Sequence, residues 1–404
     1  MATTETVQEQ EPKRDEDEDR SSRRLLVILL WILGIAAIAL LALLLWLLWP
    51  HATPSKQAAG YPIEVVTTIY GYGDQPDELL LTPLGVTFDN AGHVWISNTG
   101  QSRVEQYTTE GGYVRSLGVE AGGGQLASPY GLDVDPQTGL VYVADYGAKQ
   151  VQVYTTDGEY VGHLPADEQK LKVFGDAFSP FDVQVVEGRV VVASNDGLYF
   201  FDTDGTVVGR WVDRAGGNNV RGPEFGQFNF PDSFAVDPGT GNFYVADTLN
   251  RRVVAISPEG RWLWVSGSPD AGGSIQGFWQ LPRSVQVGPD GNLYVVDTFR
   301  PDGEGMGAGH IVVLSPNGEL LSEFGRNGYT DGSFAYPDQI AFDGGELWAM
   351  ADRQNHRVVI FRLITPYPAP SEIEADKYLG MLSNPADTWS TPKSERPASP
   401  ASDA

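Results

Sequence analysis

One pattern recurs six times along this chain and constrains its fold more than any other feature. A proline is followed by apolar residues at the third and fifth positions after it, as in PYGLDVD from Pro129 and PRSVQVG from Pro282. Such alternation is typical of a β-strand, and a repeat of roughly 40–50 residues is typical of a propeller blade. Successive prolines are 46, 51, 51, 51 and 55 residues apart (Pro83, Pro129, Pro180, Pro231, Pro282 and Pro337).

Each repeat also carries signals for further strands. A second strand, such as VYVAD or LYVVD, ends in Asp or Asn, and a third follows, such as RVVAI or RVVIF. A Gly-containing turn such as Asp157-Gly158 then leads to a fourth strand. Five of the second strands contain an aromatic residue, which we expect in the core (Trp95, Tyr142, Tyr244, Tyr294 and Trp348).

The sixth repeat ends near Leu363 without a fourth strand. The segment IEVVTTIYG, residues 63–71, resembles a fourth strand and stands just before the first repeat. If it pairs with the last blade, it closes the ring and protects the sheet edges. The sequence therefore predicts an all-β fold, a six-bladed propeller of four-stranded blades over residues 62–363.

Two segments carry a family resemblance. DTLNRRVV (247–254) and DRQNHRVV (352–359) resemble the NHL-repeat six-bladed β-propellers, and the likeness extends over all six repeats. The third repeat departs from it, because NDGLYFF lacks the usual loop and basic residue, and the fifth carries an insertion. The resemblance implies a propeller with an exposed circular face. Its members include partner-binding modules, sensor ectodomains and a few lyases or lactonase-like relatives, so the resemblance leaves the function open.

The catalytic features of the family's enzymes are not matched in this sequence. The lyases depend on histidines, which here are scattered along the chain, and Leu84 stands where the lactonase-like relatives place a metal-binding Glu. The sequence contains no G-x-S-x-G, P-loop or H-E-x-x-H motif. No catalytic residue is therefore assigned. The five histidines are His51, His93, His163, His310 and His356.

Residues 25–49 form an uncharged apolar run, long enough for one transmembrane α-helix before the propeller. Arginines precede the run, whereas the first basic residue after it is Lys56, so the N-terminus is expected in the cytoplasm. A cleaved signal peptide is the alternative, but the run is too long and no cleavage site follows. We expect an acidic cytoplasmic tail (1–24), a linker (50–61), an extracytoplasmic propeller and a mobile Pro-rich tail (364–404).

Charge and cysteine content exclude several functions. The chain has 27 Lys and Arg residues against 53 Asp and Glu, a net charge of -26, which opposes binding to nucleic acid. The absence of Cys rules out disulfides and thiolate chemistry.

The residue after each repeat proline is predicted to lie at the mouth of the central channel. Half of these residues are apolar or aromatic and half are charged, a combination typical of a specific binding site. In an alternative interpretation, Arg283 only neutralises two neighbouring carboxylates. The six are Leu84, Tyr130, Phe181, Asp232, Arg283 and Asp338. Two irregular loops, 213–230 and 298–310, add the candidates Arg221, Phe225, Arg300 and Met306.

The Asp or Asn at the end of each second strand resembles a Ca²⁺ ligand. Because it recurs in every repeat, five residues before Arg103, Arg252 and Arg357, we favour a structural role in which it holds the following loop. No cofactor is predicted, with Ca²⁺ in the channel as the alternative.

These observations favour a membrane-tethered extracytoplasmic recognition or scaffold module that binds a protein, peptide or envelope component on the channel face. The alternative is a metal-dependent extracytoplasmic hydrolase or lyase using Asp232, Asp338 or the strand-two carboxylates. An acidic face would prefer basic or polar neutral partners. The sequence leaves the ligand and the oligomeric state open.

Overall fold

The computed structural model describes residues 26, 28–31, 62–119, 123–166, 178–215, 218–267, 279–300, 308–330 and 332–364. The chain divides into two units, Met1–Lys56 and Gln57–Ala404. The described residues of the first unit are helical. In the described parts of the chain, no helix has the length and apolar character needed to cross a membrane. The expected span at 25–49 lies almost entirely outside the described residues, as do residues 1–24, 50–61 and 365–404.

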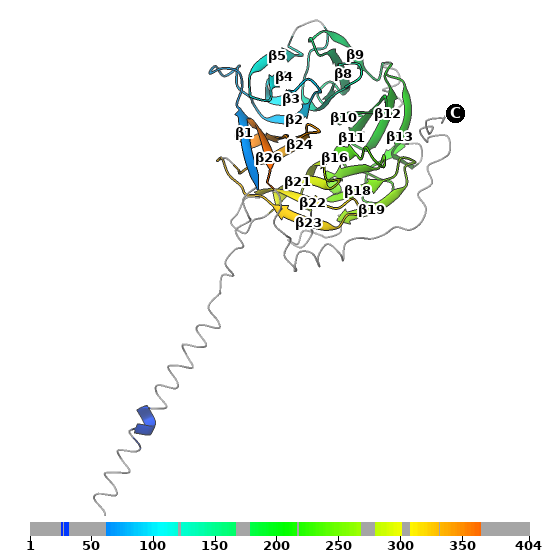
Figure 1. The fold of residues 1–404 in the computed structure, drawn as a ribbon. Coiled ribbons are helices and arrows are strands. Elements are labelled where there is room, and N and C mark those ends of the chain that lie inside the picture. The colour runs from blue at the N-terminus through cyan, green and yellow to red at the C-terminus, as the bar shows by residue number, and fades with distance from the viewer. Residues whose placement is uncertain are drawn as a thin grey trace, which may run out of the picture. The chain divides into compact units, whose positions relative to one another are not determined.

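Six four-stranded antiparallel sheets are arranged in a ring (Figure 1). The first strands of neighbouring blades contact one another and therefore surround the central channel. Blades 1 to 3 consist of β2 (Pro83–Phe88), β3 (His93–Asn98), β4 (Arg103–Thr108), β5 (Tyr113–Leu117); β6 (Pro129–Val134), β7 (Leu140–Asp145), β8 (Gln150–Thr155), β9 (Tyr160–Leu164); β10 (Pro180–Val186), β11 (Arg189–Ser194), β12 (Gly197–Asp202) and β13 (Val207–Trp211).

Blades 4 to 6 follow the same order. They consist of β16 (Pro231–Val236), β17 (Phe243–Asp247), β18 (Arg252–Ile256), β19 (Trp262–Gly267); β20 (Pro282–Val287), β21 (Leu293–Arg300), β22 (Ala308–Leu314), β23 (Leu320–Phe324); β24 (Pro337–Phe342), β25 (Trp348–Asp352), β26 (Arg357–Leu363) and β1 (Ile63–Ile69). A small hairpin, β14 (Asp213–Ala215) and β15 (Asn218–Val220), precedes blade 4. Each repeat proline opens a first strand, as predicted.

The N-terminal strand completes the last blade. β1 pairs antiparallel with β26, from Ile63 opposite Leu363 to Ile69 opposite Val358, and the two strands lie side by side in Figure 1. The backbone groups at this edge of β26 are therefore paired rather than exposed. The two ends of the propeller are held in one sheet.

The aromatic residues of the second strands are buried, as predicted. Trp95, Tyr142, Tyr244, Tyr294 and Trp348 are at most 2% exposed. Tyr294 of blade 5 and Trp348 of blade 6 lie in one apolar cluster, with ring centroids 4.6 Å apart. These side chains join neighbouring blades, and burial of each contributes about 2–3 kcal/mol.

The polar residue that ends each second strand fastens loops at one end of the blade. Asp145 accepts hydrogen bonds from the backbone N–H groups of Ala127 (2.9 Å) and Ser128 (2.8 Å). These residues precede the first strand of the blade, so the carboxylate holds mainly the preceding loop and not only the following one. In blade 3 the position belongs to Ser194, which is opposite Pro180 in the register, and not to Asn195 as the sequence pattern indicated.

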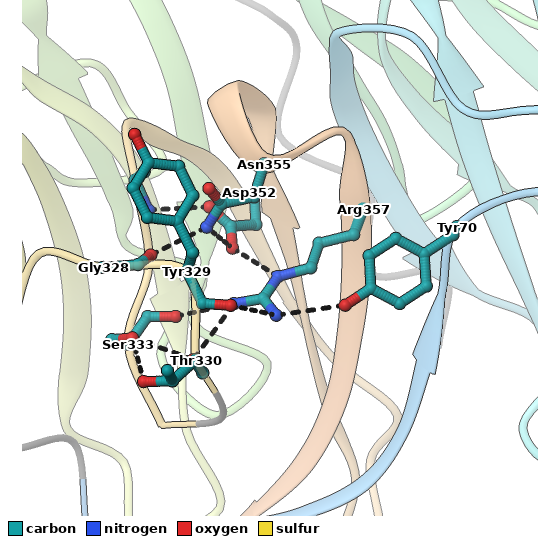
Figure 2. A network of polar contacts seen from close by, with 9 residues as sticks. Tyr70, Gly328, Tyr329, Thr330, Ser333, Asp352, Asn355 and Arg357 are labelled. Atoms are coloured by element: carbon teal, nitrogen blue, oxygen red, sulfur yellow. Dashed lines mark hydrogen bonds and ion pairs between the residues drawn. The ribbon is translucent and has the colours of Figure 1, made fainter.

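The arginine five residues later completes this network in blades 4 and 6. In blade 6, Arg357 donates from Nε to Asp352 (2.7 Å) and from Nη2 to the carbonyl oxygens of Ser333 (2.9 Å) and Thr330 (3.2 Å), as Figure 2 shows. In blade 1, Asn98 stands in place of the Asp, and Glu105 supplies the carboxylate that Arg103 contacts. The recurring residues thus have the structural role that the sequence favoured.

Candidate functional site

The six residues that follow the repeat prolines meet at one end of the channel. Leu84, Tyr130, Phe181, Asp232, Arg283 and Asp338 line a single cavity, together with Gly131, Ser233 and Gln339. They converge because each occupies the same position in the first strand of its blade. The cavity volume is only about 10 Å³, about the space of one water molecule. We call this end of the propeller the mouth face.

One side of the mouth is an aromatic wall. The ring of Phe181 lies 5.7 Å from that of Tyr130, 5.3 Å from that of Tyr146 and 5.7 Å from that of Phe230. Tyr146 remains 36% exposed. The aromatic wall therefore offers ring surface to a ligand on the mouth face.

Tyr146 was not among the predicted site residues, although the sequence contains a signal for it. The residue after the strand-two Asp or Asn is Thr in blades 1, 4 and 5, where its hydroxyl donates to the carbonyl oxygen of the next blade's first proline at 2.6–2.7 Å (Thr99, Thr248 and Thr298). Blade 2 has Tyr146 at this position, blade 3 has Asn195 and blade 6 has Arg353. Of these three departures from threonine, Tyr146 and Arg353 contact the predicted mouth residues Phe181 and Asp338.

The other side of the mouth is a charged wall. Arg283 donates from Nη1 to Asp232, and its Nη2 lies 3.8 Å from Oδ2 of Asp338. Arg353 Nη1 approaches the same Oδ2 atom at 3.6 Å. This oxygen is buried and has no hydrogen-bond partner. Arg283 thus neutralises its two neighbours, as the alternative interpretation held, but Asp338 keeps an unused acceptor. Burial raises the pKa of Asp232 to about 6, despite the opposing effect of Arg283.

A polar pair joins blades 3 and 6 beside the mouth. Gln339 of blade 6 donates from Nε2 to Oδ1 of Asp182 in blade 3 at 3.1 Å, and its Oε1 accepts from the N–H of Val86 at 2.9 Å. Asp182 is 1% exposed. Burial raises its pKa to about 7, although hydrogen bonds from Ser233, Phe234 and others act in the opposite direction.

We expect Asp182→Asn to change the pH dependence of stability. The pKa of Asp182 is raised from 3.8 to about 7 in the folded state, so between these values the folded chain holds a proton that the unfolded chain has lost, and stability falls as the pH rises. The free energy of unfolding of the variant, measured relative to that of wild type, should rise by about 2–4 kcal/mol as the pH is raised from 4 to 8. Denaturant unfolding at both pH values measures this. Glu319→Gln, at an exposed turn, serves as the control; a constant difference for Asp182→Asn would contradict the assignment.

The irregular loops contribute unequally to the mouth. Arg221 is exposed, and its guanidinium carbon lies 5.0 Å from the ring centroid of Phe230 in the aromatic wall. Phe225 packs instead on Trp262 of blade 4, with ring centroids 4.5 Å apart, and does not line the cavity. Arg300 ends β21, but its side chain is outside the described part of the structure, as is Met306.

The carboxylates proposed for the metal alternative have other partners. Asp232 is paired with Arg283, and the strand-two Asp residues accept hydrogen bonds from backbone N–H groups and arginines. Among the described residues, no three His, Asp or Glu side chains are grouped as metal ligands.

Charge is divided between the two ends of the propeller. At the end opposite the mouth, the turns between the first and second strands contain acidic residues in every blade (Asp89, Asp135, Glu187, Asp237, Asp290, Asp343 and Glu346 lie in or beside them). The turns between the third and fourth strands add Glu110, Asp157, Glu159, Asp204, Glu259 and Glu319, with Arg261 as the one basic residue in these described turns. The expectation of basic or polar neutral partners assumed an acidic channel face, and these turns, which lie at the other end, do not test it.

Comparisons with known proteins agree with the fold. Residues 126–154 match the NHL repeat. A structural genomics protein of unknown function from Bacteroides thetaiotaomicron is 16% identical, with a TM-score of 0.53, and the match covers 74% of this chain and 75% of that one. A streptogramin B lyase is 15% identical over 76% of this chain and 98% of its own, with a TM-score of 0.47. At these identities the similarity to solved structures concerns the fold alone.

Proposed function

Because this chain is an NHL-repeat six-bladed β-propeller, we propose that it is a recognition module that binds a protein partner on its mouth face. Residues 25–49 would tether it to a membrane, with the propeller outside the cytoplasm. The observation that carries the proposal is the pairing of a partly exposed aromatic wall with a charged wall around a very small cavity. Such a surface suits contact with a partner's projecting side chains better than enclosure of a small substrate.

The charged wall is not required by the blade architecture. Three of the six equivalent positions carry Leu84, Tyr130 and Phe181, and the first strands form equally well there. A partly buried group of Asp and Arg side chains adds little stability over apolar residues of similar size, since desolvation offsets the attraction between the charges. Its presence therefore favours a role in binding.

The position of the chain ends supports a tethered module. The N–H of Ile364, just after β26, donates to the carbonyl oxygen of Pro62, just before β1, at 2.7 Å. In the register of β1 with β26, Ile69 lies toward the mouth end and Ile63 toward the opposite end. The chain thus enters and leaves the propeller at the end opposite the mouth, and a tether would join the propeller at that end.

Affinity capture tests the proposal. The full-length protein would be captured from solubilised native membranes as wild type and as the triple variant Asp232→Ala, Arg283→Ala, Asp338→Ala, which removes the three charged residues that line the cavity. We expect a partner protein to be enriched at least about tenfold by wild type over the triple variant, because the variant lacks the central contacts.

A matched triple variant at the opposite end controls for the change in charge. Glu110→Ala, Arg261→Ala, Glu319→Ala removes two acids and one arginine from exposed turns and should retain the partner. Circular dichroism and melting curves establish that each variant is folded. The same proteins recovered with all three forms would contradict binding at the mouth.

A further inference from the structure

We propose that the mouth recognises a carboxylate-bearing protein segment, one in which an acidic side chain stands next to an aromatic or aliphatic one. This inference rests on the proposed function and specifies the chemistry of the partner. It follows from the placement of basic side chains, from the N–H donors that Arg353 retains, and from the exposed apolar residues around the mouth.

Basic side chains stand on the mouth face of a strongly acidic chain. Lys149, Arg221 and Arg251 are exposed in loops at this end, and the side chain of Arg353 is 40% exposed. Acidic residues at the same end include Glu224 and those of the segment 70–81, which follows the outermost strand β1. The net charge of -26 opposes an anionic partner at long range, but salt screens that repulsion, and a guanidinium beside the cavity attracts a carboxylate at contact distance.

Arg353 is the group best placed to bind a carboxylate. Its side chain is 40% exposed, and its Nη1 atom lies 3.6 Å from Asp338, too far for a good hydrogen bond. The negative charge of Asp338 is shared between Arg283 and Arg353, so it does not fully neutralise Arg353. A guanidinium has five N–H donors and pairs bidentately with a carboxylate. Arg353 therefore retains donors for a ligand.

A second guanidinium stands beyond the aromatic wall. Arg221 lies against the ring of Phe230, which contacts Phe181, and Phe181 in turn contacts Tyr130. Arg353 approaches Asp338, which lines the same cavity as Tyr130. The aromatic rings are thus placed to take an apolar side chain while an adjacent carboxylate reaches one of the arginines.

The composition of the mouth face favours a protein over a lipid headgroup or a free anion. Apart from Tyr146, the loops at this end expose Leu81 (41%) and Leu249 (49%). Tyr and Arg are enriched at protein interfaces, where apolar side chains are covered together with them. An isolated anion would make no use of these apolar side chains, and the cavity is about the size of one water.

Peptide display tests the inference with the full-length protein in detergent or nanodiscs. The probe is a library of displayed random 12-residue peptides, from which those that bind the wild-type protein are selected. We expect the selected pool to be enriched in Asp and Glu next to aromatic or aliphatic residues. For a synthetic peptide from that pool, Arg353→Glu should weaken the Kd about tenfold or more, and Tyr146→Ala should also weaken it. Arg261→Glu makes the same charge change at the opposite end and should alter the Kd less than about twofold.

Each other outcome overturns the inference. A pool that loses affinity with Tyr146→Ala but is rich in Lys and Arg, or has no charge preference, leaves the mouth as a binding site and refutes the acidic partner. An acidic pool unaffected by Arg353→Glu refutes the assigned contact. Competition by inorganic phosphate or by anionic phospholipid vesicles identifies a simpler anion or a membrane surface instead. Peptides that bind the double variant Tyr146→Ala, Arg353→Glu as well as they bind wild type refute the inference and count against the proposed function too.

Discussion

Replacing Arg357 by methionine is expected to lower the free energy of unfolding by about 3–5 kcal/mol. The side chain is 2% exposed, and its guanidinium contacts Asp352 and the carbonyl oxygens of Tyr329, Thr330 and Ser333 (Figure 2). Methionine retains much of the apolar stem. It leaves a buried carboxylate and the carbonyl groups without their shared donor, and this desolvation cost is the source of the destabilisation.

Denaturant unfolding of three variants separates the contribution of the Arg357 charge to stability from the general effect of replacing an arginine. Arg357→Met should be far less stable than Arg326→Met, because Arg326 is exposed and its loss should cost under about 0.5 kcal/mol. The double variant Asp352→Asn, Arg357→Met should recover part of the loss by removing the unpaired carboxylate. Equal stability of the two single variants would contradict the role given to Arg357.

The loss caused by Arg357→Met should also depend on pH. Burial raises the pKa of Asp352 to about 6 even with Arg357 present. Below that pH the carboxyl group is protonated and no longer needs the guanidinium, so the variant should lose less stability at pH 5 than at pH 8. The same unfolding curves measured at both pH values supply this comparison.

We expect that a chain lacking residues 62–69 will no longer form a stable monomeric propeller, and that its single cooperative unfolding transition will be lost. The deletion removes β1, uncovers the edge of β26 and empties the space of Ile69, which is 3% exposed. An uncovered strand in a six-bladed ring is a template for pairing with another chain, so aggregation should accompany the loss of stability. Size-exclusion chromatography and thermal unfolding measure both. A monomeric variant that melts like wild type would refute the importance of this closure.

A disulfide staple provides the converse test. Glu64 lies opposite Arg362 in the register of β1 and β26, and such antiparallel partners have Cα atoms about 4.5–5.5 Å apart, within the range of a disulfide. The chain contains no other cysteine, so Glu64→Cys, Arg362→Cys has one possible intramolecular bond. The oxidised form should have a higher melting temperature than the same protein after reduction, because the bond links residues 64 and 362 in the unfolded chain and lowers its conformational entropy.

The period of the repeats was sufficient to predict the blades, because each blade is built from residues close together in the chain. The alternation after Pro129 or Pro282 predicts a strand wherever that segment is placed, and the buried aromatic residues follow from the same local pattern. The one-residue error in blade 3 has a local cause as well. The turn between the first and second strands of blade 3 is one residue shorter than that of blade 1: four residues separate the paired Val185 and Val190, and five separate Phe88 and Val94. Counting residues from other repeats therefore placed the strand end at Asn195, one residue too far.

The six mouth residues could also be predicted, because repeat symmetry places equivalent positions around one axis. Repeat symmetry does not indicate which residues that depart from the repeat pattern contact one another. Gln339 and Asp182 are 157 positions apart, and Tyr146 and Arg353 looked like ordinary loop residues until closure of the ring brought them beside the same mouth. The antiparallel order of strands within each blade places the acidic turns at one end, because it carries alternate turns to opposite ends. Contacts between distant blades depend on closure of the ring, and no local pattern in the sequence encodes them.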